Sequence, residues 1–337
     1  MILSPLGYKV NNKISKVISG ITSPTYIIDL ETVEQHFKTY CEEKPVNNRV
    51  LFSVKSSHDS KLLNIAKDYV CGYDISNLTE FNCIPNTKNK IVSLCGPVFT
   101  ETDLKTIQLQ HTDRLIVVFD SLDQYNRCKP YIAENTEVMF RICTAELDDS
   151  FNSAFGIGFS DIPYHKNFIG LHIHMSRTSC LRSVDNYLKF IKMCASISGV
   201  KTINLGGGQH YYDWFALRHQ LNSSVEFIIE PGQPFFTDAI YAIGEVFSVK
   251  PKTGYSNVLT SLSIDCHLKW SRDKRLMKTQ GEKCYLFGPT CQGTDLIGEY
   301  KGKFTCGDKI VFENINPLTL EIAASFNGIQ KAGIIYV

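Results

Sequence analysis

The chain lacks any apolar run long enough to span a bilayer, and it lacks an excess of charge of either sign. Its 337 residues carry 35 Lys and Arg against 34 Asp and Glu, a formal net charge of +1 at pH 7. The one dense basic patch, RDKRLMK at 272–278, is most simply a solvated face or loop. These absences argue against a transmembrane protein and do not indicate a nucleic-acid partner.

Two further absences bear on compartment and metal binding. The first twenty residues contain no long apolar stretch followed by a small-residue cleavage site, so we expect a cytoplasmic protein. There are 12 cysteines but no CxxC pair, and this scatter in a chain without an export signal favours reduced thiols. We therefore expect no metal site.

What the chain does contain is an alternation of short apolar runs and longer amphipathic segments. Segments 59–68 and 183–198 place apolar residues three or four positions apart behind an Asp or Ser, which predicts N-capped helices. Eight runs have the length and composition of buried strands: 50–55, 71–76, 90–96, 114–120, 137–143, 168–174, 202–208 and 226–232. Strands and helices in this order predict an α/β fold, a (β/α)8 barrel of the TIM type.

The pattern of apolar and turn residues changes after about residue 240. Short alternating runs separated by Gly, Asn and Asp turns predict an antiparallel β domain: 239–250, 284–290, 308–315 and 319–328. Segments 8–10 and 16–19 are expected to add strands to the same sheet. The predicted domains are N-terminal strands over 1–22, the barrel over 23–240 and the C-terminal β domain over 241–337.

Chemistry in such a barrel lies at the carboxyl ends of the strands. The seventh predicted strand opens there into Gly206, Gly207 and Gly208. Consecutive glycines let backbone amides turn toward an anion, and the loops after strands seven and eight are the usual phosphate site of these barrels. A tight turn is the commoner explanation of a glycine run, but the position of this one favours a phosphate.

Two charged residues end strands at the same mouth. Lys55 closes the first strand and Glu230 follows the eighth, before Pro231 and Gly232. A lysine and a carboxylate around a phosphate cradle predict pyridoxal 5'-phosphate bound covalently through Lys55, with Glu230 facing the pyridine nitrogen. Covalent attachment would explain why an apolar strand ends on an ammonium group. The plainer alternatives are a lysine stem that reaches water and a carboxylate that caps a turn.

The sixth strand carries two histidines that point the same way by the two-residue period of a strand. We expect the outer one, His174, to stack on the cofactor ring, and the inner one, His172, to be a satisfied core residue.

These segments resemble those of the alanine-racemase-fold pyridoxal phosphate decarboxylases, which include the ornithine, diaminopimelate and carboxynorspermidine decarboxylases. The resemblance runs from TSPTYIIDL at 22 to FNGIQKAGI at 326. The matching segments stand in the family's order: FSVKSS, GYDISNLTE, GLHIH, NLGGGQH, EPG and GPTCQGTD. NLGGGQH, CHLK, GPTCQGTDLIGEY and SFNGI are most similar to the carboxynorspermidine decarboxylase branch.

The chain departs from the wider family at several positions. Gln233 stands where the family usually has an Arg, and Phe326 stands in place of an aromatic hydroxyl. The glycine amides, with Arg177, would then carry more of the phosphate binding. Ala154 replaces an expected basic residue, and Gln292 replaces the acid that ornithine decarboxylases use for the distal amine.

The resemblance also implies roles in the C-terminal domain. Cys291 would return a proton to the substrate carbon after carbon dioxide leaves, reaching across from the partner subunit of a homodimer with shared active sites. Asp295, Gln292 and His267 are expected at the substrate. Two plainer interpretations stay open: Cys291 as a small buried hydrophobe and Asp295 as a brace for its loop.

The resemblance leads to decarboxylation of an amino-acid-bearing polyamine such as carboxynorspermidine or carboxyspermidine. The departures, with Lys269, leave open a tailoring decarboxylase acting on an aminocarboxypropyl group of a natural product, such as a microcin C type peptide nucleotide or a siderophore precursor. A catalytically silent relative is disfavoured by Lys55, Glu230 and Cys291, and the cysteine motif suits decarboxylation better than racemization.

Overall fold

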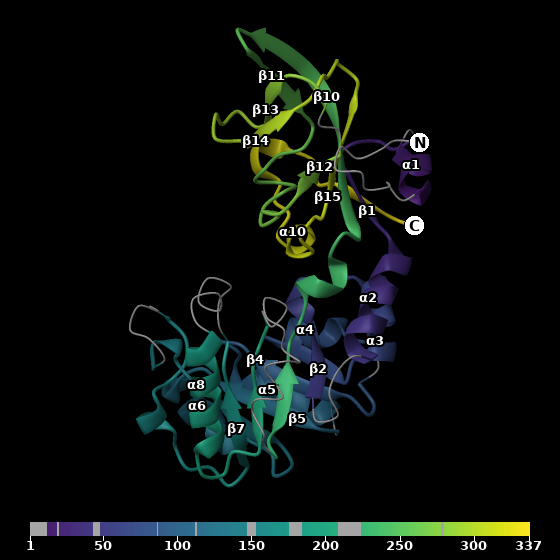
Figure 1. The fold of residues 1–337 in the computed structure, drawn as a ribbon. Coiled ribbons are helices and arrows are strands. Elements are labelled where there is room, and N and C mark those ends of the chain that lie inside the picture. The colour runs from purple at the N-terminus through teal and green to yellow at the C-terminus, as the bar shows by residue number, and fades with distance from the viewer. Residues whose placement is uncertain are drawn as a thin grey trace. The chain divides into compact units, whose positions relative to one another are not determined.

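The computed structural model describes residues 12–18, 20–42, 48–85, 87–111, 113–146, 153–174, 184–207, 224–277 and 280–337. The chain divides into two compact units, Phe37–Pro234 and a second unit formed by Met1–His36 with Phe235–Val337 (Figure 1). Among the described residues, no helix has the length and apolarity that crossing a membrane requires.

The first unit is a closed barrel of eight parallel strands, as the sequence predicts. The strands are β2 (Asn48–Ser53), β3 (Gly72–Ile75), β4 (Ile91–Cys95), β5 (Leu115–Phe119), β6 (Glu137–Arg141), β7 (Phe168–His172), β8 (Thr202–Asn204) and β9 (Glu226–Ile229). Each pairs with the next in chain order, and β9 closes on β2 in the register Val50↔Ile229. Apolar side chains fill the interior: Leu51, Ile91, Ile116, Val118, Met139 and Ile228.

Amphipathic helices lie between the strands, and several of them begin at a capping side chain. The α-helices are α2 (Leu30–Glu42), α3 (Ser60–Tyr69), α4 (Leu78–Cys83), α5 (Glu101–Gln110), α6 (Leu122–Cys128) and α8 (Val184–Ser196). Short 3-10 turns are η1 (Val54–Ser56), η2 (Lys129–Tyr131), η3 (Thr144–Glu146) and η4 (Phe159–Asp161). The predicted cap Asp59 accepts from the amides of Lys61 and Leu62, which fixes the start of α3 directly behind the first strand. The predicted cap of α8, Ser183, lies outside the described residues.

An ion network joins several strands at the amino-terminal end of the barrel. The Arg114 guanidinium contacts Glu137 at 2.7 Å and Glu226 at 2.8 Å. Glu226 also pairs with Arg49 at 2.9 Å, so one carboxylate bridges the starts of β2, β5 and β9. Bidentate networks of this kind hold geometry better than isolated surface pairs.

The second unit is built on a mixed sheet, with elements β1 (Thr25–Ile28), β10 (Ile240–Lys252), β11 (Tyr255–Thr260), β12 (Arg275–Leu276), β13 (Lys283–Phe287), β14 (Leu296–Lys301), β15 (Lys309–Glu313) and β16 (Gly333–Tyr336). The strand order is β12-β15-β10-β11-β13-β14, with β1 pairing β10 and β16 pairing β1. The pairs β11·β13 and β1·β16 are parallel. The predicted C-terminal β domain is confirmed, but its sheet is mixed and not antiparallel throughout, because long connections bring non-consecutive strands side by side.

Two segments expected as strands are helical. Residues 16–18 belong to α1 (Asn12–Ile18), because Ile14, Val17 and Ile18 have helical spacing and pack on one apolar cluster of the unit. In 319–328 the chain forms α10 (Leu318–Glu321), started by the Asn316 side chain accepting from the Leu318 amide, and then η7 (Phe326–Gly328).

The predicted domain boundaries do not coincide with those of the two compact units. Segment 8–10, expected as a strand, lies outside the described residues. Strand β1 belongs to the second unit although its residues were assigned to the barrel domain. The boundaries at 22 and 240 stay a prediction, beside unit limits at His36 and Pro234.

Candidate active site at the barrel mouth

Lys55 lies in the one-turn helix η1 directly after β2, not in the strand itself. Its side chain is exposed, whereas Val54 and Ser56 on either side are buried. The turn is seated against the segment after β9: the Ser53 amide donates to the Pro231 carbonyl at 3.3 Å. A Cβ on Gly232 would come within 1.8 Å of the Ser56 hydroxyl, so only glycine permits this approach. The lysine amine is thus presented at the carboxyl ends of the strands from a fixed turn.

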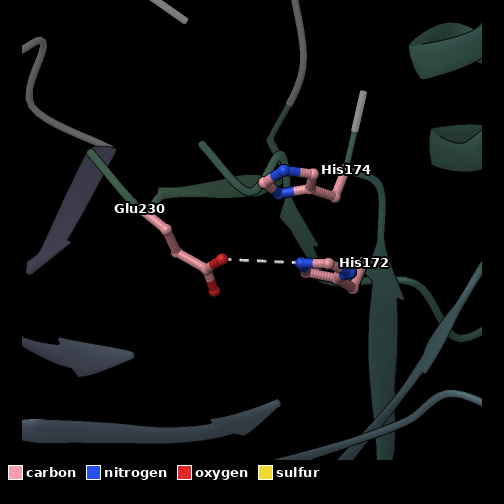
Figure 2. A group of neighbouring side chains, drawn as sticks. All are labelled: His172, His174 and Glu230. Atoms are coloured by element: carbon pink, nitrogen blue, oxygen red, sulfur yellow. Dashed lines mark ion pairs between the residues drawn. The ribbon is translucent and has the colours of Figure 1, made fainter. Parts of the chain in front are cut away.

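Glu230 is buried one residue beyond β9, with 4% of the residue exposed. Its Oε1 accepts from the Asn204 side-chain amide at 2.5 Å, and its Oε2 lies 3.5 Å from Nε2 of His172 (Figure 2). Burial alone would raise the pKa of this carboxyl, but His172, the Asn204 amide and the charge of Lys55 outweigh it and lower the pKa to about 2. Glu230 is therefore a buried anion at neutral pH, with acceptor sites to spare.

The two histidine rings lie one above the other, with centroids 6.2 Å apart and planes 18° from parallel (Figure 2). The amide of Gly207 donates to Nδ1 of His174 at 3.2 Å, so the proton of the neutral ring is on Nε2. Burial, followed by the positive charge of Lys55, lowers the pKa of His174 to about 3. Burial also lowers the pKa of His172. Both rings are neutral at pH 7.

The glycine run lies close against the His174 ring. Gly206 has φ +63°, and a Cβ there would lie 2.4 Å from Nδ1 of His174. The Gly206 amide donates to Oδ1 of Asn204 at 2.9 Å, and the Gly207 amide is taken by His174. The first two amides of the run therefore have protein acceptors in this structure, and phosphate binding by the glycine run stays a prediction. Gly208 and Arg177 lie outside the described residues.

Three groups here, His172, His174 and Glu230, have ligand atoms within 4.8 Å of one another. Ligands of a tetrahedral zinc lie about 3.3 Å apart, and imidazole lone pairs must converge on the ion. Rings only 18° from parallel do not converge, and Nδ1 of His174 already accepts a hydrogen bond. The arrangement suits a planar aromatic ligand with a protonated ring nitrogen better than a metal ion.

Two further charged side chains, Asp74 and Arg141, lie at this mouth. Asp74 on β3 accepts from Ser53 Oγ at 3.0 Å, and burial, with the nearby Glu230 charge, raises its pKa well above the usual range. Arg141 ends β6, where it pairs with Asp120 at 3.3 Å and lies 4.6 Å over the Phe155 ring. A charged residue at the end of an apolar run was the available signal for both Asp74 and Arg141.

Cys291 and Gln292 are exposed in the loop between β13 and β14 of the second unit. The Cys291 amide donates to the Asn327 side chain at 3.2 Å. Asp295 in the same loop is buried, and four donors occupy its carboxylate: Oδ1 accepts from Ser263 Oγ and the Ile264 amide, Oδ2 from the Thr290 amide and hydroxyl. This arrangement favours the bracing role over contact with a substrate.

His267, expected at the substrate, is fully buried with both ring nitrogens engaged. Its Nδ1 accepts from the Ser263 amide at 3.1 Å, so its Nε2 donates to the Gln330 carbonyl at 2.9 Å. The ring thus ties the turn at 263–267 to the C-terminal segment, which is a structural task.

The positions that depart from the family pattern have varied surroundings. Gln233 begins the turn η6 (Gln233–Phe236) and is half-buried. Ala154, Lys269 and Phe326 are exposed, and the cysteines in the described part of the chain are all free thiols.

No protein-family model matches the chain. It is 20% identical to the carboxyaminopropylagmatine decarboxylase of Synechocystis sp. over 355 aligned positions, which cover 94% of this chain and 90% of that protein. Its fold is similar to the lysine/ornithine decarboxylase of Vibrio vulnificus complexed with putrescine, with TM-score 0.77, 16% identity and coverage of 100% and 99% of the two chains. The carboxynorspermidine decarboxylase of Campylobacter jejuni complexed with norspermidine gives TM-score 0.74 and 21% identity, with 94% of each chain covered.

Proposed function

We propose that this chain, a relative of the fold type III pyridoxal phosphate decarboxylases in fold and in sequence, removes the α-carboxylate of an amino-acid-bearing polyamine such as carboxynorspermidine. One observation carries the proposal: an exposed lysine, a buried anionic glutamate and a neutral histidine ring gather at the carboxyl ends of β2, β9 and β7. The full-length likeness to polyamine-precursor decarboxylases supports the choice of substrate.

The residues present fit pyridoxal 5'-phosphate. Lys55 would hold its aldehyde, Glu230 would accept the pyridine N–H, and His174 would offer the flat face of a neutral ring. When bound, the cofactor supplies a sink for the electron pair left on the α-carbon as carbon dioxide departs. The sink requires a pyridine nitrogen that stays protonated, and therefore an anionic partner for its N–H. Glu230 suits this role, because a buried carboxylate with a pKa of about 2 keeps its acceptor sites at neutral pH.

Cys291 is the proposed proton donor to the α-carbon, and its exposure leaves the thiol accessible. We propose that it acts within a homodimer whose two active sites each take Cys291 from the partner chain. We propose that Gln292, also exposed, contacts the distal part of the substrate, since the Asp295 carboxylate is engaged.

The distal amine of ornithine is bound by an acidic side chain in ornithine decarboxylases, whereas Gln292 offers a neutral amide. We therefore expect a substrate whose distal group depends less on pairing with a carboxylate. The same observation supports the second candidate, a tailoring decarboxylase acting on an aminocarboxypropyl group of a larger natural product. Both candidates share the chemistry and differ in the distal group.

The test begins with the purified protein and added pyridoxal 5'-phosphate. We expect a visible absorption band that borohydride fixes to the chain, and the Lys55→Ala variant to lack the fixed cofactor. A matched control is Lys61→Ala, at an exposed lysine in the first turn of α3. An unchanged band in Lys55→Ala would refute the central assignment.

Carbon dioxide release then identifies the substrate class. Carboxynorspermidine, carboxyspermidine, ornithine, lysine, meso-diaminopimelate and an aminocarboxypropyl nucleotide form a sufficient panel. We expect the highest kcat/KM with the two carboxylated polyamines. A preference for the nucleotide would select the tailoring enzyme, and release from none of the panel despite bound cofactor would contradict both candidates.

A further inference from the structure

The Glu230 carboxylate is held from two neighbouring strands. Asn204, at the end of β8, donates its amide to Oε1 at 2.5 Å, and His172, at the end of β7, places Nε2 3.5 Å from Oε2. All three side chains are buried, with 0% of Asn204, 2% of His172 and 4% of Glu230 exposed. The position of the carboxylate is thus set by contacts with two buried side chains.

Asn204 connects this carboxylate to the glycine segment. Its Oδ1 accepts from the Gly206 amide at 2.9 Å, while the Glu230 amide donates to the Gly206 carbonyl at 2.7 Å. One asparagine therefore satisfies a backbone donor and a buried anion at once. An amide is the side chain that can do both, because it has a donor end and an acceptor end.

The proton on His172 can be assigned from its surroundings. Among the residues that the structure describes, Nδ1 is buried without a hydrogen-bond partner, and Nε2 faces Glu230 and, at 3.8 Å, the Cys95 thiol. A proton on Nδ1 would be a buried donor without an acceptor, which is rarer and costlier than an unused acceptor. The neutral ring therefore carries its proton on Nε2 and directs it at Glu230.

A purely space-filling role explains these residues poorly. Burying an imidazole and a carboxamide costs free energy that a leucine or phenylalanine would not. Two donors satisfy two of the roughly four acceptor sites of a carboxylate and leave room for one further donor.

We propose that Asn204 and His172 are positioning residues that clamp the Glu230 carboxylate and direct its remaining acceptor sites at the pyridine N–H of the bound cofactor. The proposal rests on the proposed function and adds two residues to which that function assigns no part. The groups surrounding the clamp are Lys55 after β2, Asp74 on β3, Cys95 on β4, Arg141 on β6 and His174 after β7.

The barrel offers a matched control for each clamp residue. Asn48 is as buried as Asn204, at the opposite end of the barrel, and both polar atoms of its side-chain amide lack a hydrogen-bond partner within the described part of the chain. His111 is as buried as His172, and its Nδ1 likewise has no partner there. Asn204→Asp is compared with Asn48→Asp, and His172→Phe with His111→Phe, so that the general cost of each change is measured separately.

The readouts are the pyridoxal 5'-phosphate dissociation constant of the apoprotein, the pH dependence of the visible band, and kcat and KM for the preferred substrate. Asn204→Asp places a second carboxylate beside Glu230, so the pair would share a proton. We expect about a tenfold to hundredfold loss of kcat with KM nearly unchanged, weaker cofactor binding, and a pH-shifted band, because the shared proton neutralises part of the Glu230 charge. His172→Phe should show a smaller loss in the same direction.

His172→Gln keeps an N–H donor and should recover most of the kcat that His172→Phe loses. Equal losses in the Gln and Phe variants, or clamp variants no different from their controls, would overturn the clamp while leaving wild-type decarboxylation intact. If His172→Phe does not fold, the Gln and Asn204→Asp variants decide. A wild-type chain without a visible band or carbon dioxide release would instead refute the proposed function, which keeps the two failures distinct.

Discussion

Asp295→Asn is the substitution that separates a bracing role from a substrate contact. The carboxylate accepts from two hydroxyls and two backbone amides, all at 2.7–3.2 Å. Either orientation of an asparagine amide turns its NH2 toward one backbone donor, from Ile264 or from Thr290. That hydrogen bond is lost, whereas a hydroxyl can rotate to accept.

The size of the effect follows from the hydrogen bonds. A bond to a charged acceptor contributes about 1.5–3 kcal/mol and a neutral one about 0.5–1.5 kcal/mol, so one lost bond and three weakened ones sum to about 4.5–7.5 kcal/mol. We expect the free energy of unfolding of the second unit to fall by this amount, with KM for the substrate altered less than threefold in the protein that remains folded.

Urea unfolding followed by tryptophan fluorescence measures the loss. The chain has two tryptophans, and in a Trp214→Phe background the remaining one, Trp270, lies in the second unit three residues beyond His267. Glu299→Gln on β14, an exposed partner of Lys283 at 3.0 Å, is the control and should unfold as the wild type does. A loss below about 1 kcal/mol combined with a KM raised a hundredfold would refute the bracing argument.

Three further outcomes are expected. Mixed and reassociated Lys55→Ala and Cys291→Ser chains should regain about a quarter of wild-type carbon dioxide release, because half of the dimers would contain one intact shared site; no recovery would contradict sharing. The pKa of His174 is lowered to about 3, so the unfolded chain binds the proton more readily, and stability should fall as pH drops from about 6.5 toward 3; His174→Gln should flatten that slope in urea midpoints measured across this range. Gly206→Ala should destabilise the barrel and weaken cofactor binding more than Gly254→Ala, since both have positive φ but a Cβ on Gly254 meets nothing within 4 Å; equal effects would show that the approach of His174 is unimportant.

The barrel could be predicted because its strands are buried on both faces. Such strands appear as continuous apolar runs, which residues 115–119 and 91–95 show clearly. The predictions of strands at 16–19 and 319–328 were wrong, because a short amphipathic stretch does not distinguish a strand from one or two helical turns. The parallel pairs of the second unit depend on long-range contacts that no local pattern contains.

The residues of the candidate site also differ in how well the sequence predicts them. The positions of Lys55, His174 and Glu230 at strand ends could be predicted because a count of apolar runs shows where each strand ends. The full hydrogen bonding of Asp295 and His267 could not be predicted, since it depends on partners up to 63 residues away along the chain. Asn204 lies within the segment NLGGGQH, yet only the structure shows that its side-chain NH2 donates to Glu230 while its side-chain oxygen accepts from the Gly206 amide.

The ion network around Arg114 has a consequence for how this barrel can change over evolutionary time. The network connects the amino-terminal ends of the strands, which lie at the opposite end of the barrel from Lys55 and Glu230. The residues that stabilise the barrel there are therefore different from those of the candidate site. Replacements such as Gln233 could accumulate around the mouth without loosening the frame. New substrate preferences are therefore most readily selected by varying the loops of the mouth while the charged base of the barrel stays constant.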